Sequence, residues 1–124
     1  MSGFTEKEVE YLGEQRLGRL AEVSASGRPH VVPVGFRVDP ELGVVDMGGR
    51  DMGRIKWSRD VAQTGRRVAF VVDDVLPPWR ARGVEVRGRA EVLGGESIRI
   101  FPERIVGWGI DPNARGPNAR SVAR

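Results

Sequence analysis

Short runs in which apolar and polar residues alternate recur along most of this chain, and each run ends at glycine, proline or aspartate. A period of two is typical of strands with one buried face, and the residues between the runs favour turns. The clearest run is Val84–Leu93 (VEVRGRAEVL), in which Gly88 is expected to mark a bulge. Its predicted inward positions are Val84, Val86, Ala90 and Val92.

The first half of the chain predicts a meander of hairpins. Two antiparallel strands are expected between Leu17 and Asp39, around the turn SASGRP. In the first of them, one phase of the alternation is occupied by Leu17, Arg19, Ala21 and Val23. A third strand is expected over Gly43–Gly48, after the turn DPELG. Successive hairpins disfavour a parallel sheet.

The second half predicts a central strand, an unpaired loop and a closing pair of strands. The predicted segments are a strand over Arg67–Asp74, a loop over residues 75–83 (VLPPWRARG), and strands over Ile98–Phe101 and Arg104–Ile110 joined by the turn PER. The tail over residues 111–124 is expected to be loosely ordered.

Two segments have a helical period instead. A helix is predicted over Phe4–Glu14, because Thr5 is a good N-cap and Glu8 completes a capping box. A mid-chain helix is predicted over Asp51–Gly65 (DMGRIKWSRDVAQTG). One helix among about six or seven short strands favours a mainly β fold, a small antiparallel barrel in a single domain over residues 1–124. An OB-fold has a similar element order and stays open.

Composition excludes several classes of function. The chain has no cysteine and one histidine, so disulfides, thiolate chemistry and a protein metal site are not expected. No apolar run approaches the roughly 20 residues of a membrane span, which predicts a cytoplasmic protein without a membrane partner. The formal net charge is +3 and acidic residues interleave the arginines, so no nucleic-acid partner is expected.

The sequence GGRDMGRIK places Gly48 and Gly49 before a predicted helix that carries Arg54 and Lys56. A helix N-terminus attracts anions, glycines allow close approach to the backbone, and arginine and lysine bind phosphate oxygens. A phosphate site and a solvated basic helix both fit this pattern.

Three other side chains are candidates. His30 could serve as an acid or base, a ligand contact or a satisfied strand-end histidine. Trp79, in the PPWRARG loop, predicts a subunit interface or a ligand lid, with an exposed loop residue as the alternative. Trp108 could cover a flat ring or pack in the core. Asp73 and Asp74 are adjacent on a strand and so point to opposite faces, which argues against a catalytic carboxylate pair.

Taken together, these segments resemble the pyridoxamine 5'-phosphate oxidase-like FMN-binding split barrels, and within them the small actinobacterial reductases that depend on a deazaflavin, coenzyme F-420. The resemblance runs nearly end to end. It is carried by FTEKEVEYLGEQRLGRLAEV, GRPHVVPVGFRVDPEL, GGRDMGRIKWSRDV, VAFVVDDVLPPWRARGVEVRGRAEV and IRIFPERIVGWGID.

The resemblance implies a split β-barrel and a homodimer with two equivalent sites at the subunit interface. The cofactor phosphate would lie against Arg54 and Lys56, and the ribityl chain near Gly48 and Gly49. The tricyclic ring would rest along Val32, Pro33 and Val34. The partner subunit would contribute from the loop around Trp79, and Trp108 would close the pocket. Relatives carry a second lysine where this chain has Trp57, which bears on phosphate binding.

The resemblance therefore implies an oxidoreductase that transfers a hydride between a deazaflavin and a small unsaturated or conjugated substrate. Such a protein binds the cofactor, orients the substrate and excludes water, so it needs no nucleophile of its own. The alternatives are an FMN-dependent oxidase or reductase and a non-catalytic carrier of a cofactor or a haem-type molecule.

One variant tests the predicted phosphate site. Replacing both Arg54 and Lys56 with alanine is expected to weaken cofactor binding by a few kcal/mol, since each charged hydrogen bond contributes roughly 1.5–3 kcal/mol. The measurement is a titration of the variant and the parent protein with the cofactor. Unchanged affinity would place the anion site elsewhere.

Overall fold

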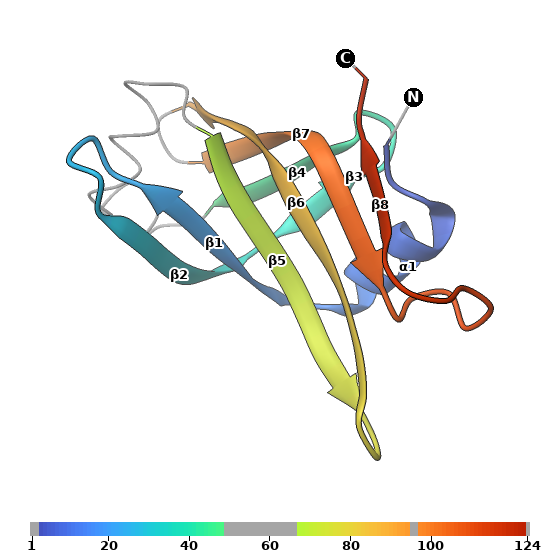
Figure 1. Ribbon diagram of the computed structural model, residues 1–124. Coiled ribbons are helices and arrows are strands. Elements are labelled where there is room, and N and C mark those ends of the chain that lie inside the picture. The colour runs from blue at the N-terminus through green and yellow to red at the C-terminus, as the bar shows by residue number, and fades with distance from the viewer. Residues whose placement is uncertain (1–2, 49–66, 95–96, 124) are drawn as a thin grey trace.

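The computed structural model of the protein describes residues 3–48, 67–94 and 97–123. Within them, eight strands form one antiparallel sheet and a single short helix packs against it (Figure 1). The predicted mainly β antiparallel barrel is therefore confirmed in class. The predicted mid-chain helix over residues 51–65, with Gly49, Arg54 and Lys56, lies outside the described residues. No helix in the described ranges has the length and apolar character that a membrane crossing requires.

Helix α1 (Glu6–Glu14) begins where the capping signal predicts. Thr5 Oγ1 accepts a hydrogen bond from the backbone N–H of Glu8 at 3.1 Å, and Glu8 Oε1 accepts one from the backbone N–H of Thr5 at 2.9 Å. This confirms the predicted capping box. Tyr11 and Leu12 are buried among the core residues of the sheet, so α1 packs against the inner face.

Strands β1 (Leu17–Val23) and β2 (Pro29–Gly35) form the first predicted hairpin. Leu20 of β1 is buried, whereas Leu17 and Val23 are 50% and 51% exposed. Because alternate residues of a strand point to opposite faces, the apolar phase of β1 that starts at Leu17 faces away from the core.

The second of the two strands predicted between Leu17 and Asp39 is divided into two observed strands. After β2 the chain turns at Phe36, and β3 (Arg37–Asp39) pairs with β4 (Val44–Gly48) instead of continuing along β1. The ring of Phe36 meets the ring of Phe70 edge to face, with centroids 5.3 Å apart. The corner therefore places an aromatic side chain against the core.

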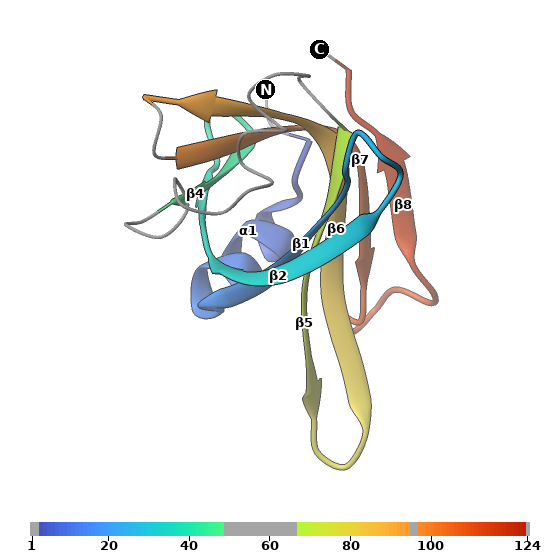
Figure 2. The same ribbon diagram turned by 90° about the vertical axis from the view of Figure 1, so that its left-hand side faces the viewer.

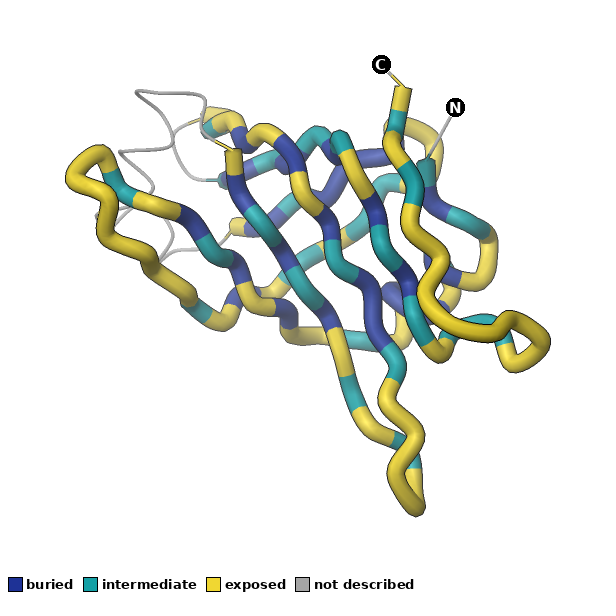
Figure 3. The backbone as a smooth tube through the Cα atoms, viewed as in Figure 1, coloured by how far each residue is buried: buried dark blue, intermediate teal, exposed yellow. Residues whose placement is uncertain are grey.

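Strand β5 (Arg67–Leu76) pairs along its whole length with the first ten residues, Arg80–Arg89, of β6 (Arg80–Leu93). The prediction of an unpaired loop over residues 75–83 is wrong. The prolines are confined to the turn, where they need no ladder hydrogen bond, and Arg82 stands opposite Asp74, so oppositely charged residues pair across the hairpin. The hairpin projects beyond the rest of the sheet (Figure 1), and its tip is exposed (Figure 3).

Strand β7 (Ser97–Trp108) is continuous, so the predicted turn PER between two strands is wrong. Pro102 lies opposite Gly88, where the register between β6 and β7 shifts. A bulge accommodates proline in a strand, which explains why the chain does not turn there. The bulge predicted at Gly88 is confirmed, as are the buried positions of Val84, Val86 and Ala90, while Val92 is half-buried.

The tail expected to be loosely ordered contains β8 (Asn118–Ser121), which pairs with β7. The Arg120 Nε donates to the carbonyl of Gly3 at 2.9 Å, and Arg120 Nη1 donates to Glu8 Oε2 at 3.1 Å. The backbone N–H of Val122 donates to the carbonyl of Glu103 at 2.8 Å. These bonds tie the tail to α1 and to the sheet.

The strands follow the order β2-β1-β5-β6-β7-β4-β3, with β8 beside β7. The first part of β7 pairs with β4 and the last part with β8, so the bulge marks the point where this edge of β7 changes partner. The sheet is strongly curled, with β2 and β4 on opposite sides of the curve (Figure 2). Its inner face holds the core, which includes Leu20, Phe70, Val86 and Ile105.

The bulge generates a prediction. A Cβ at Gly88 would collide with the backbone carbonyl oxygen of Phe101. Gly88→Ala is therefore expected to destabilise the protein by about 2 kcal/mol, because the backbone itself must shift. Urea unfolding measures this. Gly13→Ala, at an exposed helix position with open space around it, is the control and should stabilise by about 0.5–1 kcal/mol. Equal stability of Gly88→Ala and the parent would contradict the packing described.

Candidate functional site

The outer face of the sheet carries a groove of about 650 Å³ that crosses five strands. Its floor is one cross-strand row, because Val31 pairs with Ala21, Ala21 with Ala69, Ala69 with Arg87, and Arg87 with Arg104. The groove is thus apolar over β2, β1 and β5 and cationic over β6 and β7.

The buried row next to it determines this arrangement. Leu20 pairs with Phe70, Phe70 with Val86, and Val86 with Ile105, and all four side chains are 1% exposed or less. Ala21, Ala69, Arg87 and Arg104 each lie one position away from a member of this buried row and so point to the opposite face. Moving the groove row inward would move the core residues into solvent.

The charges along the groove are partly compensated. Arg67 Nε lies 3.5 Å from a carboxylate oxygen of Glu103, and Arg87 Nε donates to Glu85 Oε1 at 2.9 Å. Arg104 is exposed and has no ion pair within the described ranges. Glu22 also lines the groove but is buried. The groove therefore offers one uncompensated cation beside an apolar floor.

His30 lies at the β2 end of the groove and is exposed. The candidate for proton transfer that the sequence suggested therefore lines this groove. Its role as an acid or base stays a prediction. The groove also contains Glu22 and Glu103, whereas Asp73 and Asp74 do not line it.

Among the ring-contact residues, Pro33 is exposed, Val32 is half-buried and Val34 is buried in the core. Strand β2 ends the sheet order and, among the described strands, pairs with β1 only. Its other edge therefore presents backbone N–H and C=O groups. Gly48 is exposed at the end of β4, where the described part of the chain stops. Whether these residues bind a cofactor stays a prediction.

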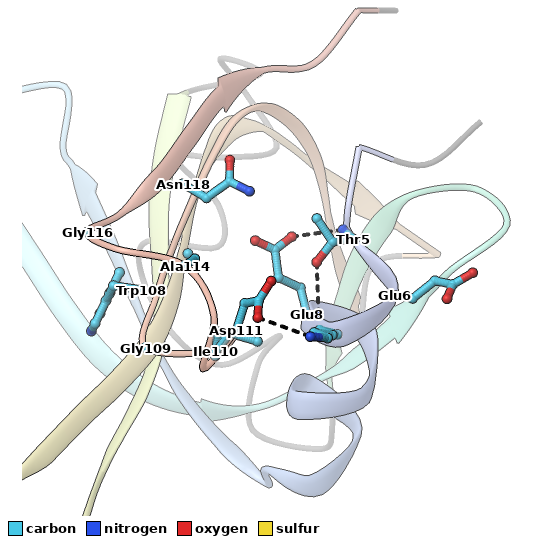
Figure 4. A pocket seen from close by; sticks show the side chains of 12 residues that line it. Thr5, Glu6, Glu8, Trp108, Gly109, Ile110, Asp111, Ala114, Gly116 and Asn118 are labelled. Atoms are coloured by element: carbon cyan, nitrogen blue, oxygen red, sulfur yellow. Dashed lines mark hydrogen bonds and ion pairs between the residues drawn. The ribbon is translucent and has the colours of Figure 1, made fainter.

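Trp108 lies away from the groove. It lines a second cavity of about 280 Å³ between the start of α1 and the tail (Figure 4). A Cβ at Gly83 would collide with the indole of Trp108, so the ring packs over that glycine. Of the three carboxylates that line this cavity, those of Glu6, Glu8 and Asp111, the Glu8 carboxylate is buried and already holds Arg120. The cavity thus lies beside the contact between Glu8 and Arg120 that ties the tail to α1.

Trp79 is 79% exposed at the tip of the β5–β6 hairpin, far along the projection that Figure 1 shows. Within one subunit the structure therefore does not bring Trp79 together with the groove or with Trp108. Its exposure is compatible with the predicted role at a subunit interface.

Sequence reasoning missed a cluster at the base of this hairpin. The Tyr11 hydroxyl donates to Asp74 Oδ1 at 3.0 Å, and Arg82 donates to both Asp74 oxygens at 2.8 and 2.9 Å. The Arg82 guanidinium also lies 4.8 Å from the centre of the Tyr11 ring. The charge pattern Asp74…Arg82 could have indicated the pair, but its contact with α1 needs the fold.

This cluster shifts the pKa of all three members, and the hydrogen bond to Asp74 raises that of Arg82. Burial, together with the hydrogen bond to Asp74, raises the pKa of Tyr11 well above its usual range, so the hydroxyl stays a donor. Hydrogen bonds from Arg82 hold the pKa of Asp74 below its ordinary 3.8. The cluster joins the base of the hairpin to α1 and so holds the hairpin in its projecting orientation.

Comparison with known proteins gives three similarities. The sequence profile described as "Pyridoxamine 5'-phosphate oxidase" matches residues 4–124. The chain is 47% identical to the 5a,11a-dehydrotetracycline/5a,11a-dehydrooxytetracycline reductase of Streptomyces rimosus, over 96% of this chain and 93% of that protein. Among solved structures it is similar to the FAD binding protein from Mycobacterium smegmatis, with a TM-score of 0.66 and 21% identity over 84% of this chain and 92% of the other.

A heme binding protein from Mycobacterium smegmatis has the same fold, with a TM-score of 0.69 and 14% identity. The match covers 98% of this chain and 60% of the other. At this level of identity the two structures share the fold alone.

The hairpin cluster generates a pH prediction. Because the folded-state pKa of Asp74 lies below its unfolded value, its stabilisation is present above that value and is lost as the pH falls. Asp74→Asn is expected to cost about 1–2 kcal/mol at neutral pH, and the gap to the parent should narrow as the pH falls below the ordinary pKa of aspartate and through the lowered pKa of Asp74. Urea unfolding across pH measures this.

The adjacent Asp73→Asn is the control. Asp73 pairs with Arg19 at 3.2 Å, and both side chains are half exposed, so its loss should cost less than about 0.5 kcal/mol. Equal costs for the two variants, or a gap for Asp74→Asn that does not depend on pH, would contradict the role assigned to the cluster.

Proposed function

Because the chain belongs to the pyridoxamine 5'-phosphate oxidase family and is an oxidoreductase, we propose that it transfers a hydride from a reduced deazaflavin, coenzyme F-420, to a small conjugated substrate. The observation that carries the proposal is the 47% identity, over nearly the whole chain, to a reductase whose named substrates are dehydro compounds. The proposed reaction is accordingly the reduction of a carbon–carbon double bond.

The described residues fit a flat redox cofactor. The edge of β2 that pairs with no other described strand offers backbone carbonyl acceptors and, except at Pro29 and Pro33, N–H donors, which can complement the polar edge of a flavin or deazaflavin ring. Pro33 and Val31 add exposed apolar surface beside that edge. In this proposal Val32, Pro33 and Val34 hold the ring, Gly48 and Gly49 lie near the ribityl chain, and Arg54 and Lys56 hold the phosphate.

When bound, the reduced deazaflavin supplies a hydride, and one proton from water or His30 completes the addition of two hydrogens to the substrate double bond. The protein's own contribution is binding and orientation. The apolar floor of the groove places the substrate flat, and the β2 edge lies along the same side of the sheet. In this proposal the proton comes from water or from His30, which lines the β2 end of the groove.

The proposal includes a homodimer with one site in each half of the interface. The outer face exposes Leu17, Val23 and Val31, which is 69% exposed, and the hairpin adds Val75 and Trp79. Exposed apolar patches of this kind mark interaction sites. A groove open to water is also a poor place for hydride transfer, so a second copy that covers it would exclude water. A cytoplasmic location stays part of the proposal, because other enzymes must regenerate the reduced cofactor.

An FMN- or FAD-dependent reaction is the second candidate, which the likeness to a flavin-binding structure favours. A carrier of a haem-type molecule is the third, and a heme-binding structure shares the fold. A yellow protein that releases flavin on denaturation would support the second. Tight binding without turnover would support the third.

The test is a titration of the purified protein with the deazaflavin and, separately, with FMN, followed by assay of the reduced deazaflavin with a polycyclic enone. Micromolar or tighter binding of the deazaflavin and substrate-dependent oxidation are expected. Light scattering should give twice the 13.6 kDa chain mass. If neither cofactor binds at micromolar concentration, the proposal is wrong.

A further inference from the structure

We propose that the outer groove binds a flat, fused-ring substrate that carries an acidic enol, phenol or carboxyl oxygen, and that Arg104 binds this oxygen. The inference rests on the proposed function and deepens it, because it names the class of substrate and the side chain that selects it.

The shape of the groove carries the first step. Neighbouring strands lie about 4.8 Å apart, so a row across five strands spans roughly 19 Å. The half formed by Val31, Ala21 and Ala69 is apolar, and the small side chains of the two alanines leave room above the sheet. A surface that is long, flat and apolar matches fused rings better than it matches a branched or globular ligand.

The charges of the groove are unevenly compensated. Arg87 and Arg104 stand directly opposite each other in the β6–β7 register, an arrangement in which like charges repel. Glu85 pairs with Arg87, and Glu103 pairs with both Arg67 and Arg89, at 3.5 Å from each. Glu22 is buried, and His30 lies at the far end of the row. An anionic group of a ligand would therefore gain the most favourable interaction at Arg104, which has no ion pair within the described residues.

The bulge carries the third step. Pro102 and Ile105 are both buried, although regular alternation would place them on opposite faces. The extra residue in β7 lets both point inward and leaves Glu103 and Arg104 between them on the outer side. Bulges commonly re-aim side chains next to active sites. This one places Arg104 in the groove.

Such an arrangement suits the proposed reaction. When a hydride adds to a double bond conjugated with a carbonyl, negative charge develops on the oxygen. Where the acidic oxygen that Arg104 binds is itself conjugated with the reacting double bond, the guanidinium stabilises this charge, so Arg104 would act on both substrate affinity and rate.

The experiment compares two probes that differ in charge alone, 2-anthroate and its neutral amide, anthracene-2-carboxamide. Fluorescence titration of the cofactor-free protein measures their affinities. The parent protein is expected to bind 2-anthroate at least fivefold more tightly than the amide, and Arg104→Gln should abolish the difference. The control Arg115→Gln makes the same charge change on an exposed loop residue outside the groove and should leave the preference intact.

A second variant tests the apolar floor. Val31→Ser, at a strongly exposed position, should weaken both probes at least threefold without changing their ratio. The thermal unfolding midpoints of all variants should match the parent. With a polycyclic substrate whose enol oxygen is conjugated with the reducible double bond, Arg104→Gln should lower kcat as well as raise KM, and Arg104→Lys should restore part of each.

Equal affinity of the parent for the two probes, binding of neither, or a preference that survives in Arg104→Gln would overturn the inference. These outcomes leave the proposed function intact if the reduced deazaflavin is still oxidised by substrate. Conversely, a charge preference at Arg104 without deazaflavin-dependent turnover would refute the proposed function and keep the groove as an anion-selective ring site.

Discussion

The structure depends on the burial of one face of a single curled sheet. Leu20, Phe70, Val86 and Ile105 meet across four neighbouring strands and are almost fully excluded from solvent. Burying side chains of this size supplies roughly 1.5–3 kcal/mol each, which makes any slip of register expensive. Alternate residues of each strand point to opposite faces of the sheet. The residues that form the core therefore also determine which residues line the groove on the outer face. The same strand register thus determines both the packing of the core and the residues of the groove.

Two irregularities adapt this sheet to a site. The bulge at Gly88 and Pro102 turns Arg104 outward and lets β7 exchange β4 for β8 as its neighbour. The projecting β5–β6 hairpin carries Trp79 away from the body, and Tyr11, Asp74 and Arg82 hold its base. The first feature supplies the cation of the proposed substrate groove, and the second supplies an exposed surface for the proposed second copy.

Local signals predicted much of this from the sequence. The capping box at Thr5 and Glu8, the alternation of Val84 and Val86, and the bulge at Gly88 depend on neighbouring residues alone, and the structure confirms them. The turn expected at Pro102 is absent because β7 itself bulges there, and Gly88 of the partner strand has no Cβ to collide with the Phe101 carbonyl. That compensation lies in a different strand.

The groove was invisible for a related reason. Ala21, Ala69, Arg87 and Arg104 are far apart along the chain, and nothing in their own surroundings joins them. Only the register of five strands places them in one row. The same holds for β8, whose short sequence has weak strand propensity but gains Arg120 bonds to α1. The resemblance to a known family supplied the expected reaction, whereas the substrate surface needed the structure.

The central claim is that the outer face of this sheet brings a reduced deazaflavin and a conjugated substrate into direct contact. The most direct test uses reduced deazaflavin that carries deuterium at its hydride-donating carbon, with the product of a polycyclic enone analysed by mass spectrometry and NMR. The account predicts one deuterium on carbon, at a single position and on a single face of the product. Product formed without the label, or with label scattered over both faces, would contradict it.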